Sequence, residues 1–206
     1  MVLANAAQPS ATTVQARKTH GPAERTPDTV IFISDPTKNG PESYGLPLAN
    51  TTWLSDMIAL IQRVTRADVR VNDEVVGAIE RGILALIGVR QGDDAASADR
   101  LLERILAYRI FPDEQGRMNL SLADIRGGLL LVPQFTLAAD TRKGNRAGFS
   151  TAAAPEVARR LFDYLLVQAR TSQVPVQAGI FGADMQVALV NNGPVTFWLE
   201  TPLPEV

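Results

Sequence analysis

The sequence of 206 residues contains no cysteine and only one histidine, His20. Without cysteine there can be no disulfide, no thiolate nucleophile and no cysteine-ligated zinc or iron–sulfur site. We expect His20 to lie outside the folded domain, which would then have no Ser–His–Asp triad, no histidine base and no histidine-ligated metal. We therefore predict no metal and no cofactor. Any chemistry must come from hydroxyls, carboxylates, backbone amides or the substrate itself.

Long apolar runs and an excess of positive charge are also missing. The one apolar run near the start of the chain, Val30–Ile33, is too short to span a membrane or to form the core of a signal peptide. Twenty Lys and Arg against 22 Asp and Glu give a net charge of −2, which argues against a protein that coats duplex DNA. A protein that binds only the end of a nucleic acid remains possible. We expect a cytoplasmic protein with neither membrane nor DNA as a partner.

Residues 1–56 differ in composition from the rest of the chain. They hold six of the 13 prolines and His20, and they show no sustained periodicity. This composition is typical of a disordered extension. Met57 opens the first periodic segment, so we predict a single domain over 57–206. Residues 1–56 are interpreted as disordered, or as absent from the native protein with Met57 as its true start.

The rest of the chain alternates short apolar segments with turn signals. A hairpin is predicted around Asn72-Asp73, and the continuous apolar run Gly82–Val89 predicts a central strand buried on both faces. Leu129–Val132 and Phe135–Leu137 flank Pro133, which marks a strand break or bulge. Three further strands are expected at the end of the chain, over 174–180, 185–191 and 195–200.

Two helices are predicted among these strands. One follows Ser97 as a candidate N-cap and extends to Arg109, and the other begins at Pro155 and extends to Gln168. Strands with two dispersed helices indicate an α+β fold with a largely antiparallel or mixed sheet.

Three polar segments interrupt or follow the apolar strands. In Pro133–Leu137, Thr136 is either a solvent-facing strand residue or part of a site, because unpaired polar groups are costly to bury. Asn191–Thr196 is either a hairpin turn or a rigid wedge, since Gly193 allows close backbone approach and Pro194 can adopt a cis peptide bond at a low energetic cost. Asp140–Arg146 is either a solvated loop or a phosphate-binding segment formed by the basic residues Arg142, Lys143 and Arg146.

Six segments, in order along the chain, resemble the D-aminoacyl-tRNA deacylase family. They are Met57–Val64, Tyr108–Phe111, Met118–Leu120, Gln134–Thr141, Met185–Val187 and Leu189–Thr196. Each segment alone is weakly specific, but together they cover the chain from Met57 to about Glu200.

The resemblance implies a homodimer that hydrolyses the ester linking a D-amino acid, or glycine on mischarged tRNA, to the 3′-terminal adenosine of tRNA. It assigns catalysis to Gln134, Phe135 and Thr136. It also implies that Gly193 and Pro194 of one subunit form a Gly–cis-Pro wedge that enters the partner's pocket and rejects L-amino acids.

The resemblance further places Arg63 where it would hold this wedge in orientation, and Met185 in a strand beside the pocket. Two departures stand out. Pro133 occupies the position of the family's usual serine, so that hydroxyl cannot be essential here. The basic loop continues Arg146-Ala147-Gly148-Phe149 where relatives often have Arg-Pro-Ser-Phe, so this loop, with Arg142, Lys143 and Arg146 as its expected tRNA contacts, departs here from the family's pattern.

Two mechanisms remain open. Thr136 could attack the ester directly, but an unactivated hydroxyl needs a base. Alternatively, the backbone amides of Phe135 and Thr136 bind the ester carbonyl while water attacks with help from the ribose 2′-OH, and we favour this route. Three rival functions are a non-catalytic module that binds RNA ends, a generic esterase and a purely structural dimer. Turnover of aminoacyl-tRNA, and its dependence on the tRNA, distinguishes them.

Overall fold

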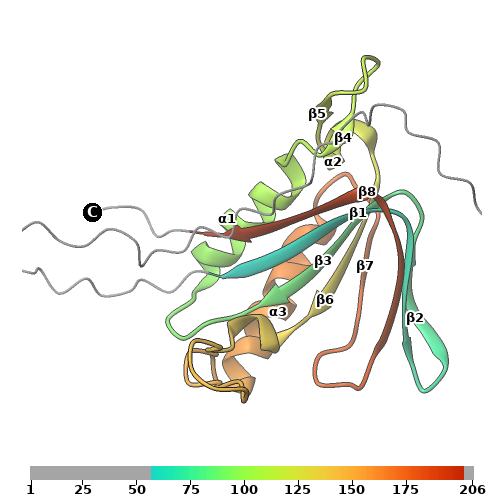
Figure 1. Cartoon of the computed structure of the whole chain (residues 1–206). Coiled ribbons are helices and arrows are strands. Elements are labelled where there is room, and N and C mark those ends of the chain that lie inside the picture. Colours follow the sequence, from blue (N-terminus) through green and yellow to red (C-terminus); the bar gives the residue numbers. More distant parts are fainter. Residues whose placement is uncertain (1–56, 202–206) are drawn as a thin grey trace, which may run out of the picture. The chain divides into compact units, whose positions relative to one another are not determined.

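The computed structural model describes residues 57–201, so the prediction for residues 1–56 lies outside the described residues. These residues form one mixed sheet, a small two-stranded sheet and the helices that cover them (Figure 1). In chain order, the elements are β1 (Ile58–Val71), β2 (Glu74–Ile79), β3 (Gly82–Gly88), α1 (Ala95–Ala107), β4 (Phe111–Pro112), β5 (Met118–Leu120), α2 (Leu122–Ile125), β6 (Gly128–Pro133), the 3₁₀ helix η1 (Phe135–Ala138), α3 (Pro155–Arg170), β7 (Val176–Ala178) and β8 (Gln186–Glu200). The α+β prediction is confirmed.

The main sheet is organised around β1. Along one edge, the first half of β1 (58–64) pairs with β3 and its second half (67–71) pairs with β2, both antiparallel. The other edge of β1 pairs antiparallel with β8. Strand β6 joins β3 in parallel, and β7 joins β6 in parallel, which makes the sheet mixed. The sheet curls until β2 meets β7. A Cβ on Gly77 would lie 2.8 Å from the carbonyl oxygen of Ala178, so only glycine permits this approach.

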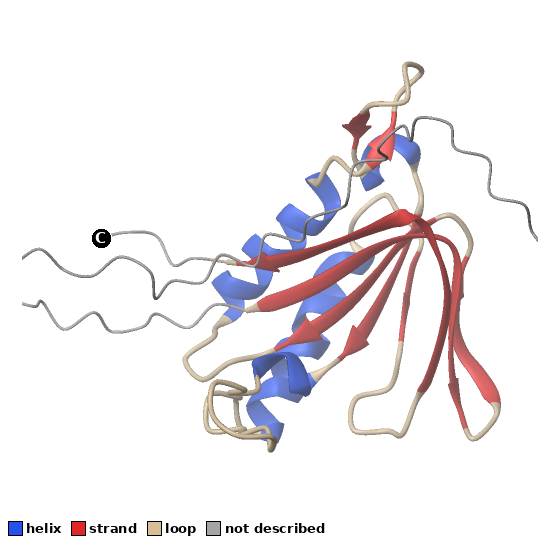
Figure 2. Cartoon of the chain, in the orientation of Figure 1, coloured by secondary structure: helices blue, strands red, loops and turns tan. Residues whose placement is uncertain are grey.

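Two hydrophobic cores lie on opposite faces of the sheet. The larger one fills the space between the sheet and helices α1 and α3, which lie on one face of the sheet (Figure 2). The smaller one lies inside the curl and includes Val64, Val69 and Leu130. Strands β3 and β6 contribute to both cores, which explains why their sequences are continuous apolar runs rather than alternating ones.

Several local predictions are confirmed. Asn72 and Asp73 both have positive φ angles, 50° and 65°, as a two-residue hairpin turn requires. Pro155 occupies the beginning of α3, where its missing N–H costs nothing.

Strand β7 is shorter than the expected strand over 174–180. No helix within residues 57–201 has both the length and the apolar character needed to cross a membrane.

The predicted N-cap of the first helix is wrong. Asp94 caps α1, and its side chain accepts a hydrogen bond of 2.8 Å from the amide of Ser97. The hydroxyl of Ser97 also bonds to Asp94, at 3.0 Å, from inside the first turn. Both Asp94 and Ser97 are residue types that cap a helix whose apolar face begins at Leu101. The Asp94 carboxylate, three residues before Ser97, takes that role.

The last two predicted strands are one strand. Residues before and after the segment 192–195 both pair with β1, since Asn191 lies opposite Val64 and Thr196 lies opposite Gln62. The hairpin-turn interpretation of Asn191–Thr196 is therefore wrong. The segment is a wide bulge that projects from a continuous β8, with a cis peptide bond between Gly193 and Pro194.

Candidate active site

A cavity of about 710 Å³ opens beside the carboxyl end of β6. Its walls come from η1, the start of α3 and the segment between β7 and β8, and they are mainly apolar. The residues that line the cavity include Pro133, Gln134, Phe135, Phe149, Phe181 and Met185. Of the residues assigned to the site from sequence, four therefore border one cavity or lie next to it: Gln134, Phe135, Thr136 and Met185.

Pro133 ends the ladder between β3 and β6. Pro133 lies opposite Ile87, and the amide of Gln134 then makes the last bond, 2.7 Å to the Ile87 carbonyl. The chain next turns into η1 instead of continuing as a strand. Thr136 is thus not a strand residue, and the break predicted at Pro133 leads into a 3₁₀ helix.

The turn into η1 leaves two backbone donors without acceptors. Within residues 57–201, the amides of Phe135 and Thr136 donate to no main-chain or side-chain oxygen, whereas the amide of Leu137 bonds to Gln134 at 3.2 Å. Both residues are exposed at the cavity mouth. Two free adjacent amides form a site for an oxygen that carries negative charge.

The hydroxyl of Thr136 has no base beside it. Among residues 57–201, its only side-chain partner is the amide group of Gln134, 2.5 Å away. An amide takes no proton in either orientation, so Gln134 cannot activate Thr136 as a nucleophile. Among residues 57–201, no group of three acidic or histidine side chains is placed to hold a metal ion.

The Phe135 side chain lines the cavity and is largely exposed. It is 58% exposed and packs against Phe149, with ring centroids 5.1 Å apart. An aromatic ring this exposed beside two free amides offers a surface for a flat apolar group of a ligand.

The basic loop after η1 is only partly free to bind an anion. Asp140 accepts two hydrogen bonds from the Arg142 guanidinium, 2.9 Å from Nε and 2.8 Å from Nη2. These bonds hold the pKa of the Asp140 carboxyl far below its usual range and raise the pKa of Arg142. Lys143 and Arg146 are exposed and form no ion pair with any residue of 57–201. The loop therefore presents two free cations rather than three.

The Gly193–Pro194 bulge is held on its first side by Arg63. The Arg63 guanidinium donates from Nε to the Asn192 carbonyl at 2.7 Å and from Nη1 to the Ile110 carbonyl. Burial, and then the nearby charge of Arg81, lower the pKa of Arg63. The family resemblance predicts that Arg63 holds this segment in orientation; the structure shows its bonds to the Asn192 and Ile110 carbonyls, and the role itself stays a prediction.

Asn191 holds the second side of the bulge, and sequence reasoning missed this residue. Its side-chain oxygen accepts from the Val195 amide at 2.7 Å, and its nitrogen lies 3.2 Å from the Val195 carbonyl and 3.1 Å from the Thr196 hydroxyl. The available signal was an asparagine four residues before Val195, at the start of a segment with strong turn residues.

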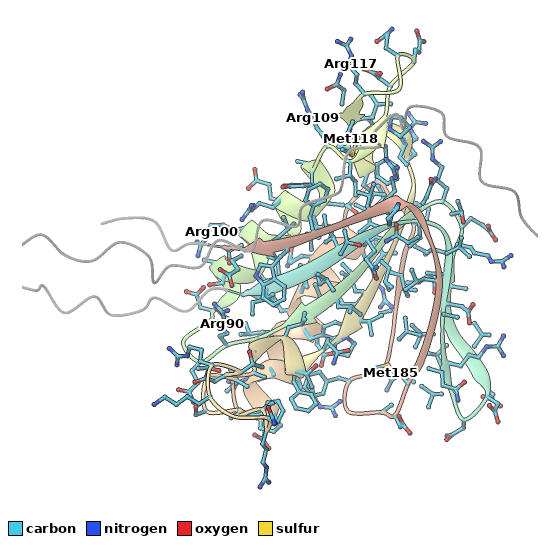
Figure 3. The ribbon with its side chains drawn as sticks, viewed as in Figure 1. Arg90, Arg100, Arg109, Arg117, Met118 and Met185 are labelled. Atoms are coloured by element: carbon cyan, nitrogen blue, oxygen red, sulfur yellow. The ribbon has the colours of Figure 1, made fainter. Side chains whose placement is uncertain are left out.

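The bulge and the cavity lie at opposite ends of the sheet in one subunit. The bulge leaves β8 opposite Val64, which pairs with Gly82 at one end of β3, whereas Pro133 pairs with Ile87 at the other end. At about 3.3 Å per residue, the strand from Gly82 to Ile87 separates them by roughly 17 Å. In Figure 3, Met185 marks the cavity end, whereas Arg109, which precedes the Arg63-bound Ile110, lies at the other. One subunit therefore does not bring Gly193 and Pro194 to its own cavity.

Comparison with known proteins places this fold in a family. The family model for D-Tyr-tRNA(Tyr) deacylase matches residues 60–200. The D-aminoacyl-tRNA deacylase of Thioalkalivibrio sulfidiphilus is 67% identical over 148 residues, which are 72% of this chain and 99% of that protein. That of Alkalilimnicola ehrlichii is 67% identical over 144 residues, 70% of this chain and 96% of that protein.

Two solved structures share this fold. The c-Myc DNA Unwinding Element Binding Protein is 40% identical with a TM-score of 0.68, covering 71% of this chain and 99% of that one. A probable eukaryotic D-amino acid tRNA deacylase, 19% identical with a TM-score of 0.62, covers 71% of this chain and all of its own, and shares the fold. This chain therefore belongs to the D-Tyr-tRNA(Tyr) deacylase family, a family of hydrolases.

Proposed function

We propose that this chain hydrolyses the ester between a D-amino acid, or glycine on mischarged tRNA, and the 3′-terminal adenosine of tRNA. It would do so as a homodimer, in the cytoplasm, as a step of translation quality control. The observation that carries the proposal is the pair of free amides, of Phe135 and Thr136, at the mouth of an apolar cavity. Donors fixed in advance where an oxyanion develops are a large source of rate enhancement in ester hydrolysis.

In the proposed mechanism the substrate supplies what the protein lacks. The ester carbonyl accepts hydrogen bonds from the two free amides, and water attacks with the ribose 2′-OH assisting proton transfer. This route is favoured over attack by Thr136 because, within the described part of the chain, the Thr136 hydroxyl is bonded only to the amide of Gln134, which is no base. The nearest carboxylate along the chain, Asp140, is bound to Arg142. Pro133 fits this route, since no hydroxyl is needed at that position.

The proposed homodimer brings the bulge to the cavity. Since Gly193 and Pro194 lie roughly 17 Å from the cavity end of their own sheet, a second copy would have to deliver them. Exposed apolar side chains along β8 support an interface on this strand. They are Val187, Val190 and Trp198, which are 37%, 42% and 48% exposed in the single subunit.

Selectivity for D-residues follows from this arrangement. The backbone of Gly193 and Pro194 would lie where an L side chain would have to go, while the amino group and hydrogen of a D-residue fit against it. Its side chain would point outward, so many D-residues are accepted. Glycine, which has no side chain to reject, would be a second substrate.

The tRNA end would be held by charge and by stacking. Lys143 and Arg146 are free to contact phosphates, and Arg142 would contribute less because Asp140 occupies its guanidinium. The exposed Phe135 ring beside Phe149 offers a surface on which the terminal adenine could stack.

A deacylation assay with matched D-, L- and glycyl-tRNA tests the proposal. We expect rapid release of D-residues and glycine and little release of L-residues. A protein that binds charged tRNA without releasing the amino acid would instead be an RNA-end-binding module, and one that hydrolyses small esters equally well would be a generic esterase. For the mechanism, a tRNA ending in 2′-deoxyadenosine and charged at its 3′-OH should react far more slowly; normal turnover would exclude the 2′-OH role.

A further inference from the structure

We infer that Asn191 is a positioning residue for chiral selection, because its side chain fixes the tip formed by Gly193 and Pro194. The inference rests on the proposed function and adds to it a residue that never touches the substrate. Asn191 acts through the main chain of Val195 and the hydroxyl of Thr196.

The bulge lacks the ladder bonds that hold the rest of β8. Asn191 lies opposite Val64 and Thr196 opposite Gln62, so the four residues 192–195 face the single residue Arg63. No residue of 192–195 takes part in the register with β1. A segment of four residues without ladder bonds would be free to move unless side chains replace those bonds.

The Asn191 side chain replaces them at Val195. Its oxygen accepts from the Val195 amide at 2.7 Å, and its nitrogen donates to the Val195 carbonyl at 3.2 Å. A strand neighbour would make the same two kinds of bond, one to the N–H and one to the C=O of this residue. The remaining hydrogen of the Asn191 amide is directed to Thr196 Oγ1 at 3.1 Å, so the whole amide group is used.

Thr196 connects this contact to the sheet. Its hydroxyl also accepts from Gln62 Nε2 at 3.3 Å, and Gln62 belongs to β1. On the other side of the bulge, Arg63, also in β1, binds the Asn192 carbonyl. Both sides are therefore tied to β1, by Arg63 before the tip and by Asn191 and Thr196 after it. Only Gly193 and Pro194 lie beyond these contacts.

This construction matters because a steric filter discriminates only while its parts stay in place. If the second side is released, the tip can retreat from an incoming L side chain, and the contact with a D-substrate is loosened at the same time. Loss of the Asn191 contacts should therefore reduce the ratio of D to L hydrolysis, and not only the overall rate.

The test compares Asn191→Ala and Thr196→Val with the wild type in deacylation of D- and L-tyrosyl-tRNA. We expect the ratio of kcat/KM for D over L to fall about tenfold in Asn191→Ala, the size of effect expected for lost hydrogen bonds to main-chain groups. Thr196→Val keeps the shape and the Val195 bonds but loses the hydroxyl, so its ratio should fall less. This variant keeps the test valid if Asn191→Ala folds poorly.

The matched control is Asn119→Ala. Asn119 also uses its amide nitrogen in a side-chain bond, 2.6 Å to Asp113 Oδ2, but this bond stays within the β4–β5 hairpin and does not reach the bulge. It should lose stability while keeping the D-over-L ratio. Wild-type ratios in both Asn191→Ala and Thr196→Val, with only their melting temperatures lowered, would overturn the inference. Failure of the proposed function would appear differently, as a wild-type protein that does not hydrolyse D-tyrosyl-tRNA or does not prefer it.

Discussion

The two polar interruptions of the sheet are built in opposite ways. In the bulge of β8, side chains of Arg63 and Asn191 bind the main chain on both sides of Gly193 and Pro194. At the start of η1, the amides of Phe135 and Thr136 have no acceptor among residues 57–201. In one region side chains bind the main chain on both sides of the tip, and the other region presents open donors.

This difference suggests a division of labour. A segment with completed bonds is suited to hold a shape, which is what steric selection requires. A segment with open donors is suited to receive an oxygen from outside, which is what catalysis requires. Because the two regions lie at opposite ends of one subunit, they can act on the same substrate only across a dimer.

The largest effect is expected from mixing two inactive variants, Gly193→Ala and Phe135→Pro. Gly193 has φ of +154°, and a Cβ there would lie 2.5 Å from Val195 Cγ2, so the first variant should distort and enlarge the tip and thereby block the partner's cavity. The second removes one open donor. Random pairing of the two chains should restore about a quarter of wild-type kcat, because half of the dimers are mixed and each has one intact composite site. No restoration after co-refolding would place both regions in one subunit.

The second prediction separates the Phe135 amide from the Phe135 ring. Proline suits the first position of η1, because this amide has no acceptor to lose and Gln134 is already extended, at φ −141° and ψ 80°. Phe135→Pro should lower kcat by roughly 10²–10³-fold, as for loss of one oxyanion donor. Phe135→Leu keeps the N–H and should mainly raise KM. Equal kcat for the two variants would remove the amide from the mechanism.

Features that depend on residues close together in the chain were predictable from sequence, and features that depend on distant segments were not. The Asn72-Asp73 turn, the helix start at Pro155 and the two-sided burial of β3 were predicted because each depends on residues close together in the chain. The bulge was interpreted partly as a hairpin, since a turn signal does not say whether the flanking strands pair with each other or with a third strand. That choice is made by β1, which is more than 120 residues away in sequence.

Site residues divide in the same way. Gln134, Phe135 and Thr136 were assigned to catalysis by the family resemblance, after Gln134 and Thr136 had stood out as polar residues between apolar runs. The fate of Phe135–Leu137 was not predictable, because their apolar pattern fits a strand as well as a 3₁₀ helix. Asn191 was missed because two of its three bonds go to the main chain of Val195, which leaves no signature in the sequence.

The third prediction concerns the one hydroxyl in the open region. Thr136→Val keeps the side-chain shape and the Thr136 amide but removes the oxygen bonded to Gln134. We expect kcat to fall less than tenfold, since the hydroxyl has no base and the amide remains. Rates of single turnover with D-tyrosyl-tRNA measure this step directly. A loss comparable to that of Phe135→Pro would instead make Thr136 the nucleophile and exclude substrate-assisted hydrolysis.

The smallest effect is expected in the basic loop, where one cation is bonded within the protein and two others are not. The Arg142 guanidinium is bonded to the Asp140 carboxylate, whereas Lys143 and Arg146 form no ion pair with any residue of 57–201. Each lost contact to a single-stranded phosphate should reduce the slope of log KM against log salt by roughly 0.7, so Lys143→Gln and Arg146→Gln should each show this change. Arg142→Gln should leave the slope near that of the wild type.

The depressed pKa of Asp140 keeps its carboxylate ionised from pH 5 to 8, and the Asp140–Arg142 pair is lost only as the pH falls through that lowered value. The ranking of the three variants should therefore hold across this range. A slope change in Arg142→Gln as large as in Lys143→Gln would mean that RNA displaces Asp140 from the guanidinium.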